Sequence, residues 1–349
     1  MNMKRWIAGV VLIFLLFAGG LVGIALAPNT PAFEGTRGVK IPRAATFPQV
    51  VDSLQSAGIL RYRKPFVWLA RLTGWHRQIK AGYYTFEAGA SNYHLLSVLR
   101  RGLQTPVRVT IPPGSRPEVI AAVVCKALAC VPDSMLVALR DSSLAAELGT
   151  DTSHLFGRLL PDTYFFYWLT DPRTVIRRVH QHFLEFFTPE RRARADSLGL
   201  TIDEVITLAS IVEWEARPDE RPRIAGVYLN RLRRGMPLQA DPTVQYAILQ
   251  REGQKRRLLF ADYRIAHPYN TYRFRGLPPG PITNPSPNAI DAVLYAEAHD
   301  YLYFVADGEG GHIFSRTFRE HVRAANRYRR LMQQRRREAR TPTGDEADG

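Results

Sequence analysis

The sequence predicts an α+β protein with an apolar N-terminal helix, a small α/β domain after it, and a larger mixed α+β domain in the second half. Three observations predict this class. An uncharged run of 22 residues lies near the N-terminus, a strand, helix, helix, strand pattern follows it, and Pro- and Gly-rich turns separate short apolar segments in residues 201–321. With 349 residues, 46% of them hydrophobic, the chain can form two or three domains.

Residues 6–27 are predicted to form a transmembrane helix, because about 20 apolar residues in helical form cross a bilayer. Basic residues precede the run, so residues 1–5 are expected in the cytoplasm and the body of the chain on the periplasmic side of the inner membrane. A cleaved signal peptide is the alternative, since Ala25-Leu26-Ala27 resembles a processing site. A retained anchor is favoured, because the run exceeds the roughly 7 to 15 residues of a signal-peptide core and Pro28 would obstruct a peptidase.

The part that follows is expected to contain a linker, a small domain and a helical connection. Residues 28–37 are proline-rich and predict the linker. Residues 38–107 predict the small domain, with strands and helices in the order "VKIP", "TFPQVVDSLQSAGIL", "KPFVWLARLTGW" and "AGYYTF". Residues 108–200 are expected to be mostly helical, with an aromatic cluster at 159–168 in the core or at a domain interface.

The only two cysteines are Cys125 and Cys130. They are five residues apart in a segment that resembles a helix, and the spacing matches no zinc motif. Two small buried side chains are favoured over a disulfide, although an exported domain permits one.

The chain carries a net charge of +15, about half of which lies near the C-terminus. Residues 319–340 contain nine Arg and two Glu. Residues 322–349 are therefore expected to form a solvated basic helix followed by a disordered tail, "TPTGDEADG". Nucleic acid is not expected as a partner, because this stretch lies on the exported side of the anchor.

The stretch "TLASIVEWEARPDE" predicts the end of a buried helix. Thr201 and Glu204 form a capping-box pattern, and apolar residues then recur at helical spacing. The helix must end before Pro218, so Glu213 and Glu215 lie in its last turn. Two residues apart, they differ by about 160° around the axis and cannot face each other.

An acid at a helix C-terminus is unfavourable, because the helix dipole is negative there. The same field, with apolar neighbours, raises a carboxyl pKa and favours the protonated form that a general acid needs. The alternative is that both glutamates are exposed and compensated by Arg217. The polar, turn-rich stretches that follow favour a binding cleft for hydroxyl and amide groups.

Several phrases in this order resemble the YceG-like family of endolytic murein transglycosylases, which are cell-wall enzymes anchored in the inner membrane. They are "KAGYYTF", "PDTYFF", "LASIVEWEA", "VYLNRLRRGMPLQADPTVQYA", "YNTYRFRGLPPGPI" and "YLYFVADGEGGHIFSRTFREH". The resemblance implies a LysM-like domain over residues 38–107 and a catalytic domain over residues 201–321. It implies that Glu215, the second acid of the family's E-x-E, is catalytic. Trp214 departs from the basic or polar residue that is common between the two acids.

A lytic transglycosylase needs one carboxyl, which first protonates the leaving oxygen and then takes the proton of the sugar's own C6 hydroxyl. Glu213 is expected to brace the helix end or a loop. Further residues are expected to line or support sugar subsites, although each is equally explained by loop architecture: Asn230, Gln239, Asp241, Thr243, Tyr269, Asn270, Thr271, Tyr272 and His312.

Two other functions stay open. A wall-binding scaffold would bind glycan without cleaving it, and a hydrolytic muramidase would need a second carboxylate near Glu215, for instance Asp241. No cofactor or metal is expected, since no cofactor motif occurs and His180 and His182 point apart on a helix. The expected partners are peptidoglycan strands, the inner membrane and peptidoglycan synthases.

Overall fold

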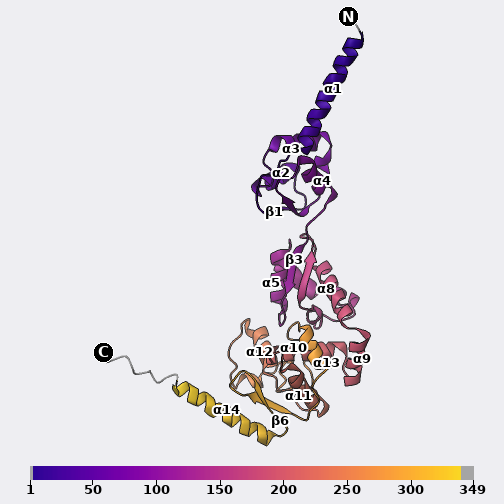
Figure 1. The fold of residues 1–349 in the computed structure, drawn as a ribbon. Coiled ribbons are helices and arrows are strands. Elements are labelled where there is room, and N and C mark those ends of the chain that lie inside the picture. The colour runs from indigo at the N-terminus through magenta and orange to yellow at the C-terminus, as the bar shows by residue number, and fades with distance from the viewer. Residues whose placement is uncertain (1–2, 339–349) are drawn as a thin grey trace, which may run out of the picture. The chain divides into compact units, whose positions relative to one another are not determined.

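The computed structural model describes residues 3–338, which divide into two compact units (Figure 1). Unit 1 extends through Val109 and includes residues 124–130 and 164–171. Unit 2 comprises residues 110–123 and 131–163 and the described chain from Pro172 onward. The predicted disordered tail, residues 341–349, lies outside the described residues.

Helix α1 (Met3–Leu26) is uncharged from Trp6 onward, and most of its large apolar side chains are exposed. Its segment Trp6–Leu26 has a mean hydropathy of 2.7 and is long enough to span a bilayer, a test that a signal sequence also passes. The end of α1 is attached to unit 1, because the Asn92 side-chain amide donates a 2.9 Å hydrogen bond to the carbonyl oxygen of Ile24.

The predicted strand, helix, helix, strand order of unit 1 is confirmed. Strands β1 (Thr36–Ile41) and β2 (Gly82–Glu87) pair antiparallel and flank helices α2 (Phe47–Ser56) and α3 (Arg63–Leu72). Helix α4 (Asn92–Arg101) follows, capped by Ser91 at its start and by left-handed Gly102 after its end. One core joins all five elements, and it includes Val39, Leu54, Phe66, Tyr84 and Leu95.

The connection predicted to be mostly helical also contains a strand. Strand β4 (Asp162–Phe166) pairs with β3 (Val107–Ile111). Tyr164 and Phe166 are buried and their neighbours are exposed, which is the period-two pattern of a strand. The remaining elements are helices α5 (Pro117–Ala127), α6 (Pro132–Leu139), α7 (Ser142–Glu147), α8 (Pro172–Phe186) and α9 (Pro189–Leu198), and the 3₁₀ turn η2 (Leu155–Arg158).

The expectation of two unpaired cysteines is wrong, because Cys125 and Cys130 form a disulfide. Helix α5 ends at Ala127, between the two residues. The chain turns there and brings their Cα atoms to 4.9 Å, within the range that a disulfide bridges. On one continuous helix, residues five apart would point in different directions.

Unit 2 is built around helix α10 (Ile202–Glu215), in which every residue from Val205 to Val212 is buried. It packs against α11 (Arg221–Arg233), α12 (Asp241–Glu252) and α13 (Pro287–Leu294) (Figure 1). The antiparallel hairpin of β5 (Tyr303–Ala306) and β6 (His312–Ser315) follows, and then the basic helix α14 (Phe318–Glu338), which begins four residues before the predicted 322. Enclosure of α10 on several sides explains why all of residues 205–212 are buried and not only one face of the helix.

Candidate active site

The end of helix α10 has the form predicted from the sequence. The capping box of Thr201 and Glu204 is present at its start, and the helix ends at Glu215 with an extended Ala216 before Pro218. Glu213 and Glu215 therefore lie in the last turn, and their side chains have different partners.

Glu213 is bonded to the loop before α13 and to the start of α11. One carboxylate oxygen accepts a 2.7 Å hydrogen bond from Arg221, and the other accepts from the backbone N–H (2.9 Å) and the hydroxyl (2.5 Å) of Ser286. The Glu213 and Arg221 side chains are only 8% and 9% exposed. This is a buried ion pair in which both carboxylate oxygens accept hydrogen bonds, so Glu213 is a poor candidate for proton transfer.

Glu215 is different, because its carboxyl is covered but not neutralised. Burial and then the nearby negative charge of Asp241 raise the pKa of Glu215 to about 7. The predicted direction of this shift is confirmed, and burial is its main cause. A carboxyl with a pKa near 7 can donate a proton and later accept one.

Helix α11 places two groups beside Glu215 that oppose this shift, the Tyr228 hydroxyl and the Arg231 guanidinium. Oε2 of Glu215 and the Tyr228 hydroxyl are both buried, and neither has a hydrogen-bond partner among the described residues, so the hydroxyl acts on the carboxyl through its dipole. Arg231 is buried and donates to the carbonyl oxygens of Leu302 (2.6 Å) and Leu238 (2.7 Å). Its charge is thus held in place by neutral acceptors.

Asp241 is the first residue of α12 and is oriented by two tyrosines. Its Oδ1 accepts a 2.5 Å hydrogen bond from the Tyr272 hydroxyl, and its Oδ2 accepts a 3.2 Å bond from the Tyr263 hydroxyl. Burial is the main cause that raises the pKa of both tyrosines, so both remain protonated donors at neutral pH.

Glu215 and Asp241 lie on one open groove of about 750 Å³, which we call the Glu215 groove. Its volume is within the range of small-molecule and oligosaccharide sites. The groove is lined by Glu213, Trp214, Glu215, Asp241, Pro242, Gln245, Lys255, Arg257, Leu258 and Tyr263.

Trp214, between the two acids, forms part of the groove wall. Its indole N–H donates a 3.0 Å hydrogen bond to the carbonyl oxygen of Gly114, and the ammonium of Lys255 lies 3.6 Å from the centre of its ring. Gly114 has a left-handed φ of 64°, and a Cβ atom there would meet the indole nitrogen at 3.3 Å. A small residue at 114 thus allows the indole to lie against this turn.

Four of the predicted site residues form the scaffold of the groove. Thr243 and Thr271 are buried and share a 2.9 Å hydrogen bond between their hydroxyls. Asn270, also buried, donates to the carbonyl oxygens of Tyr263 and Ile265. Gln239 has a φ of 50° and donates its backbone N–H to Thr271.

Three other predicted residues have partners away from the Glu215 groove. Asn230 donates to the carbonyl oxygens of His299 (2.7 Å) and Tyr301 (3.1 Å). The His312 ring lies 2.8 Å from a carboxylate oxygen of Glu220. Tyr269 lines a separate pocket and lies 4.7 Å from the ring of Tyr246.

No group of three or more metal-binding side chains occurs in residues 3–338. His180 is buried beside Arg158, and burial lowers its pKa to about 4. His182 instead pairs with Asp162 at 3.1 Å.

Sequence reasoning missed Tyr228, Arg231, Tyr263 and Lys255. Tyr228 and Arg231 are three apart on α11, a spacing that places them on one face, and this could have been noticed in "VYLNRLRRG". Tyr263 and Lys255 lie in a charged segment without periodicity, and only the fold brings them to Glu215.

Comparison with known proteins identifies the family of this chain. Residues 39–327 match the YceG-like family. The endolytic murein transglycosylase of Bacillus subtilis (strain 168) is 28% identical over 322 residues, covering 87% of this chain and 88% of the relative. That of Streptococcus pneumoniae serotype 2 (strain D39) is 31% identical over 343 residues, covering 88% of this chain but only 62% of the relative.

A solved structure is similar as well. The 2.6 Å crystal structure of a putative yceG-like protein from Listeria monocytogenes has a TM-score of 0.59 and 26% identity, covering 83% of this chain and 99% of that one. The resemblance inferred from the motifs is confirmed, and this chain belongs to the YceG-like family.

Proposed function

We propose that this protein is an endolytic murein transglycosylase in which Glu215 acts as both acid and base. The supporting observation is that the buried Glu215 carboxyl, with a pKa of about 7, lies on the wall of an open polar groove. The names of its relatives support the same substrate class.

In the first step, Glu215 protonates the oxygen that links C1 of N-acetylmuramic acid to C4 of N-acetylglucosamine, and the C1–O bond breaks. In the second step, the C6 hydroxyl of the same muramic acid attacks C1. Its proton passes to the Glu215 carboxylate, and a 1,6-anhydro ring closes. The substrate supplies the nucleophile, so water takes no part and the enzyme regains its starting protonation state.

The surroundings of Glu215 fit these two steps. Burial and Asp241 keep the carboxyl protonated before the first step. Between the steps it is an anion, which the fixed Arg231 cation and the Tyr228 hydroxyl stabilise. Preorganised charge of this kind needs little rearrangement during the reaction.

The other predicted site residues are assigned supporting roles. Tyr272 orients Asp241, and Glu213 braces the end of α10 through Arg221 and Ser286. Gln239, Thr243, Asn270 and Thr271 hold the segments beside the groove. Asn230, Tyr269 and His312 support other parts of unit 2, away from the Glu215 groove.

We also propose that α1 is a retained anchor and that the protein acts at the outer face of the inner membrane. The hydrogen bond from Asn92 to Ile24 supports retention, since it makes the end of α1 part of unit 1. The Cys125–Cys130 disulfide supports an oxidising compartment. In this proposal residues 38–107 form a LysM-like domain near the membrane, residues 201–321 form the catalytic domain, and peptidoglycan synthases are partners.

A second candidate is a hydrolytic muramidase, because Asp241 lies in the same groove as Glu215. Both oxygens of Asp241 accept hydrogen bonds from tyrosines, which suits a fixed electrostatic role better than nucleophilic attack. A scaffold that binds glycan without cleaving it is the third possibility, and the pKa of Glu215 argues against it.

Digestion of purified peptidoglycan by the full chain in detergent, followed by mass spectrometry of the products, separates these functions. Anhydro ends, lighter by one water than hydrolysed ends, support the transglycosylase. Reducing ends support the muramidase, and intact glycan supports the scaffold. Glu215→Gln should reduce cleavage by about 1000-fold or more without unfolding the protein. Normal cleavage by this variant would refute the assignment of Glu215.

A further inference from the structure

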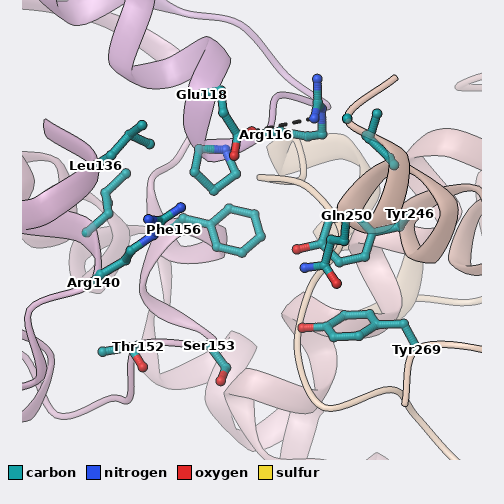
Figure 2. A pocket seen from close by; sticks show the side chains of 14 residues that line it. Arg116, Glu118, Leu136, Arg140, Thr152, Ser153, Phe156, Tyr246, Gln250 and Tyr269 are labelled. Carbon is teal, nitrogen blue, oxygen red and sulfur yellow. Dashed lines mark ion pairs between the residues drawn. The ribbon is translucent and has the colours of Figure 1, made fainter. Parts of the chain in front are cut away.

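A second cavity of about 710 Å³ lies within unit 2, and we call it the α5–α12 pocket (Figure 2). Arg116 and Glu118 lie at the start of α5, at one end of the pocket. Tyr246 and Gln250 of α12 lie with Tyr269 on one side, across from Leu136 and Arg140. Its volume is that of a site for a small ligand or a short peptide.

The pocket and the Glu215 groove share helix α12. Asp241 and Gln245 of this helix line the groove, whereas Tyr246 and Gln250 line the pocket. Consecutive helical residues such as 245 and 246 point about 100° apart, so α12 presents adjacent faces to the two cavities.

The cavities are also close at their edges. Burial lowers the pKa of Lys255 in the groove, and the positive charge of Arg116 in the pocket lowers it further. The loop 269–272 contributes to both cavities, since Tyr269 lines the pocket and Tyr272 holds Asp241 of the groove. One extended substrate can therefore reach both.

The charges of the pocket match a peptide with free carboxylates and one amine. Arg116 and Arg140 contribute two cations, and Glu118, 3.5 Å from Arg116, contributes one anion. Arg140, the residue after the end of α6, has no side-chain hydrogen bond or ion pair to another described residue. Arginine binds carboxylates in a bidentate manner, and an unpaired guanidinium is available for this purpose.

The walls of the pocket add apolar contacts and neutral hydrogen-bonding groups. Phe156 and Tyr246 are each 6% exposed, and the rings of Tyr246 and Tyr269 lie 4.7 Å apart. Thr152, Ser153 and Gln250 supply hydroxyl and amide groups. A few polar groups on an aromatic wall are typical of sites that recognise a specific ligand.

We propose that the α5–α12 pocket binds the stem peptide of the murein strand whose glycan lies in the Glu215 groove, with Arg116 and Arg140 binding its carboxylates. This proposal rests on the proposed function, because it identifies the peptide-bearing strand as the substrate. Glu118 would accept a hydrogen bond from the amine of the peptide's third residue.

Direct binding tests the pocket independently of cleavage. The probe is a synthetic stem pentapeptide with a free α-carboxylate on its γ-linked D-glutamate, a basic third residue and a free C-terminus. The matched control is the same peptide with both carboxylates amidated. Titration by NMR up to about 10 mM, the weak end of specific binding, should detect the free peptide but not the amidated one.

Arg116→Gln and Arg140→Gln should each weaken binding about fivefold or more, as expected for the loss of one charge-assisted hydrogen bond. Arg234→Gln, at an exposed arginine after α11, is the control and should bind normally. Thermal unfolding of each variant checks its folding. No binding of the free peptide, equal binding of both peptides, or unchanged binding in both pocket variants overturns the proposal.

Cleavage provides the second measurement. The wild type should cleave peptide-bearing strands with a lower KM than strands from which an amidase has removed the peptides, and Arg140→Gln should remove that preference without changing kcat. Equal KM values for both substrates in the wild type overturn the proposal. Failure to produce anhydro ends from either substrate would instead contradict the proposed function, and the two failures are thereby distinguished.

Discussion

The Tyr272 hydroxyl donates a 2.5 Å hydrogen bond to Asp241, the carboxylate whose charge helps to raise the pKa of Glu215 to about 7. The proposed catalytic acid, Glu215, is thus influenced by Asp241, 26 positions later in the chain. Asp241 is in turn oriented by Tyr272, a further 31 positions along.

The pH dependence of cleavage should follow the protonation of Glu215. Because its pKa is about 7 and the acid form starts the reaction, kcat/KM should fall about tenfold per pH unit above pH 7. Asp241→Asn removes the charge that raises this pKa, so the decline should begin at a lower pH, with little loss of kcat/KM near pH 5. A loss of about 100-fold or more at every pH would identify Asp241 as a second catalytic group.

The stability of the protein should depend on the same titration. In the unfolded chain Glu215 loses its proton near its ordinary pKa of 4.5, whereas in the folded chain it keeps the proton up to about pH 7. Ionisation of Glu215 therefore lowers the free energy of unfolding. This loss is absent below pH 4.5, grows between pH 4.5 and pH 7 and is complete above pH 7. Glu215→Gln should therefore raise the free energy of unfolding at pH 8 by about 1 to 3 kcal/mol, but hardly at pH 4. Equal gains at the two pH values, measured by denaturant titration, would contradict this explanation.

Glu213→Gln should damage stability more than chemistry. The substitution breaks an ion pair whose side chains are 8% and 9% exposed and leaves the Arg221 charge without its anion, at a cost of about 3 kcal/mol. The exposed pair of Arg223 and Glu297 is the control, and Arg223→Gln should cost about 1 kcal/mol or less. At a temperature where the Glu213 variant is folded, it should still give the wild-type product, and a loss as large as that of Glu215→Gln would show that Glu213 takes part in the reaction.

The disulfide can be detected chemically. The two cysteines should take up an alkylating reagent only after reduction, which mass spectrometry of the protein isolated from its native compartment measures. Replacement of both by Ser should lower the free energy of unfolding by about 2 kcal/mol, because the loop between Cys125 and Cys130 is short. Alkylation without reduction would show that the bridge is absent from the mature protein.

Capping residues, prolines and the spacing of apolar residues were sufficient to predict the helix that carries Glu213 and Glu215. The capping box at Thr201 and the proline at 218 gave the bounds of α10, and from them the divergence of Glu213 and Glu215. The raised pKa of Glu215 could be predicted from its apolar neighbours. The size of the pKa shift also depends on Tyr228 and Arg231, which the packing of α11 against α10 brings close.

The features that were not predicted either lack a clear local pattern or depend on distant contacts. The turn after α5 that pairs Cys125 with Cys130 has no clear pattern, and the residues of β4 were included in a helical region although they alternate between buried and exposed. Asn230 and His312 have the polar character expected of a site, but their partners, the 299–301 loop and Glu220, lie about 70 to 90 positions away in sequence.

The bond between Asn92 and the carbonyl oxygen of Ile24 has a mechanical consequence. Because α1 contacts α4 and is hydrogen-bonded to it at this point, the orientation of α1 is linked to that of unit 1. If α1 crosses a bilayer, its tilt sets which side of unit 1 faces the lipid headgroups. A change in bilayer thickness would then change the tilt of α1 and, with it, the orientation of unit 1 relative to the membrane.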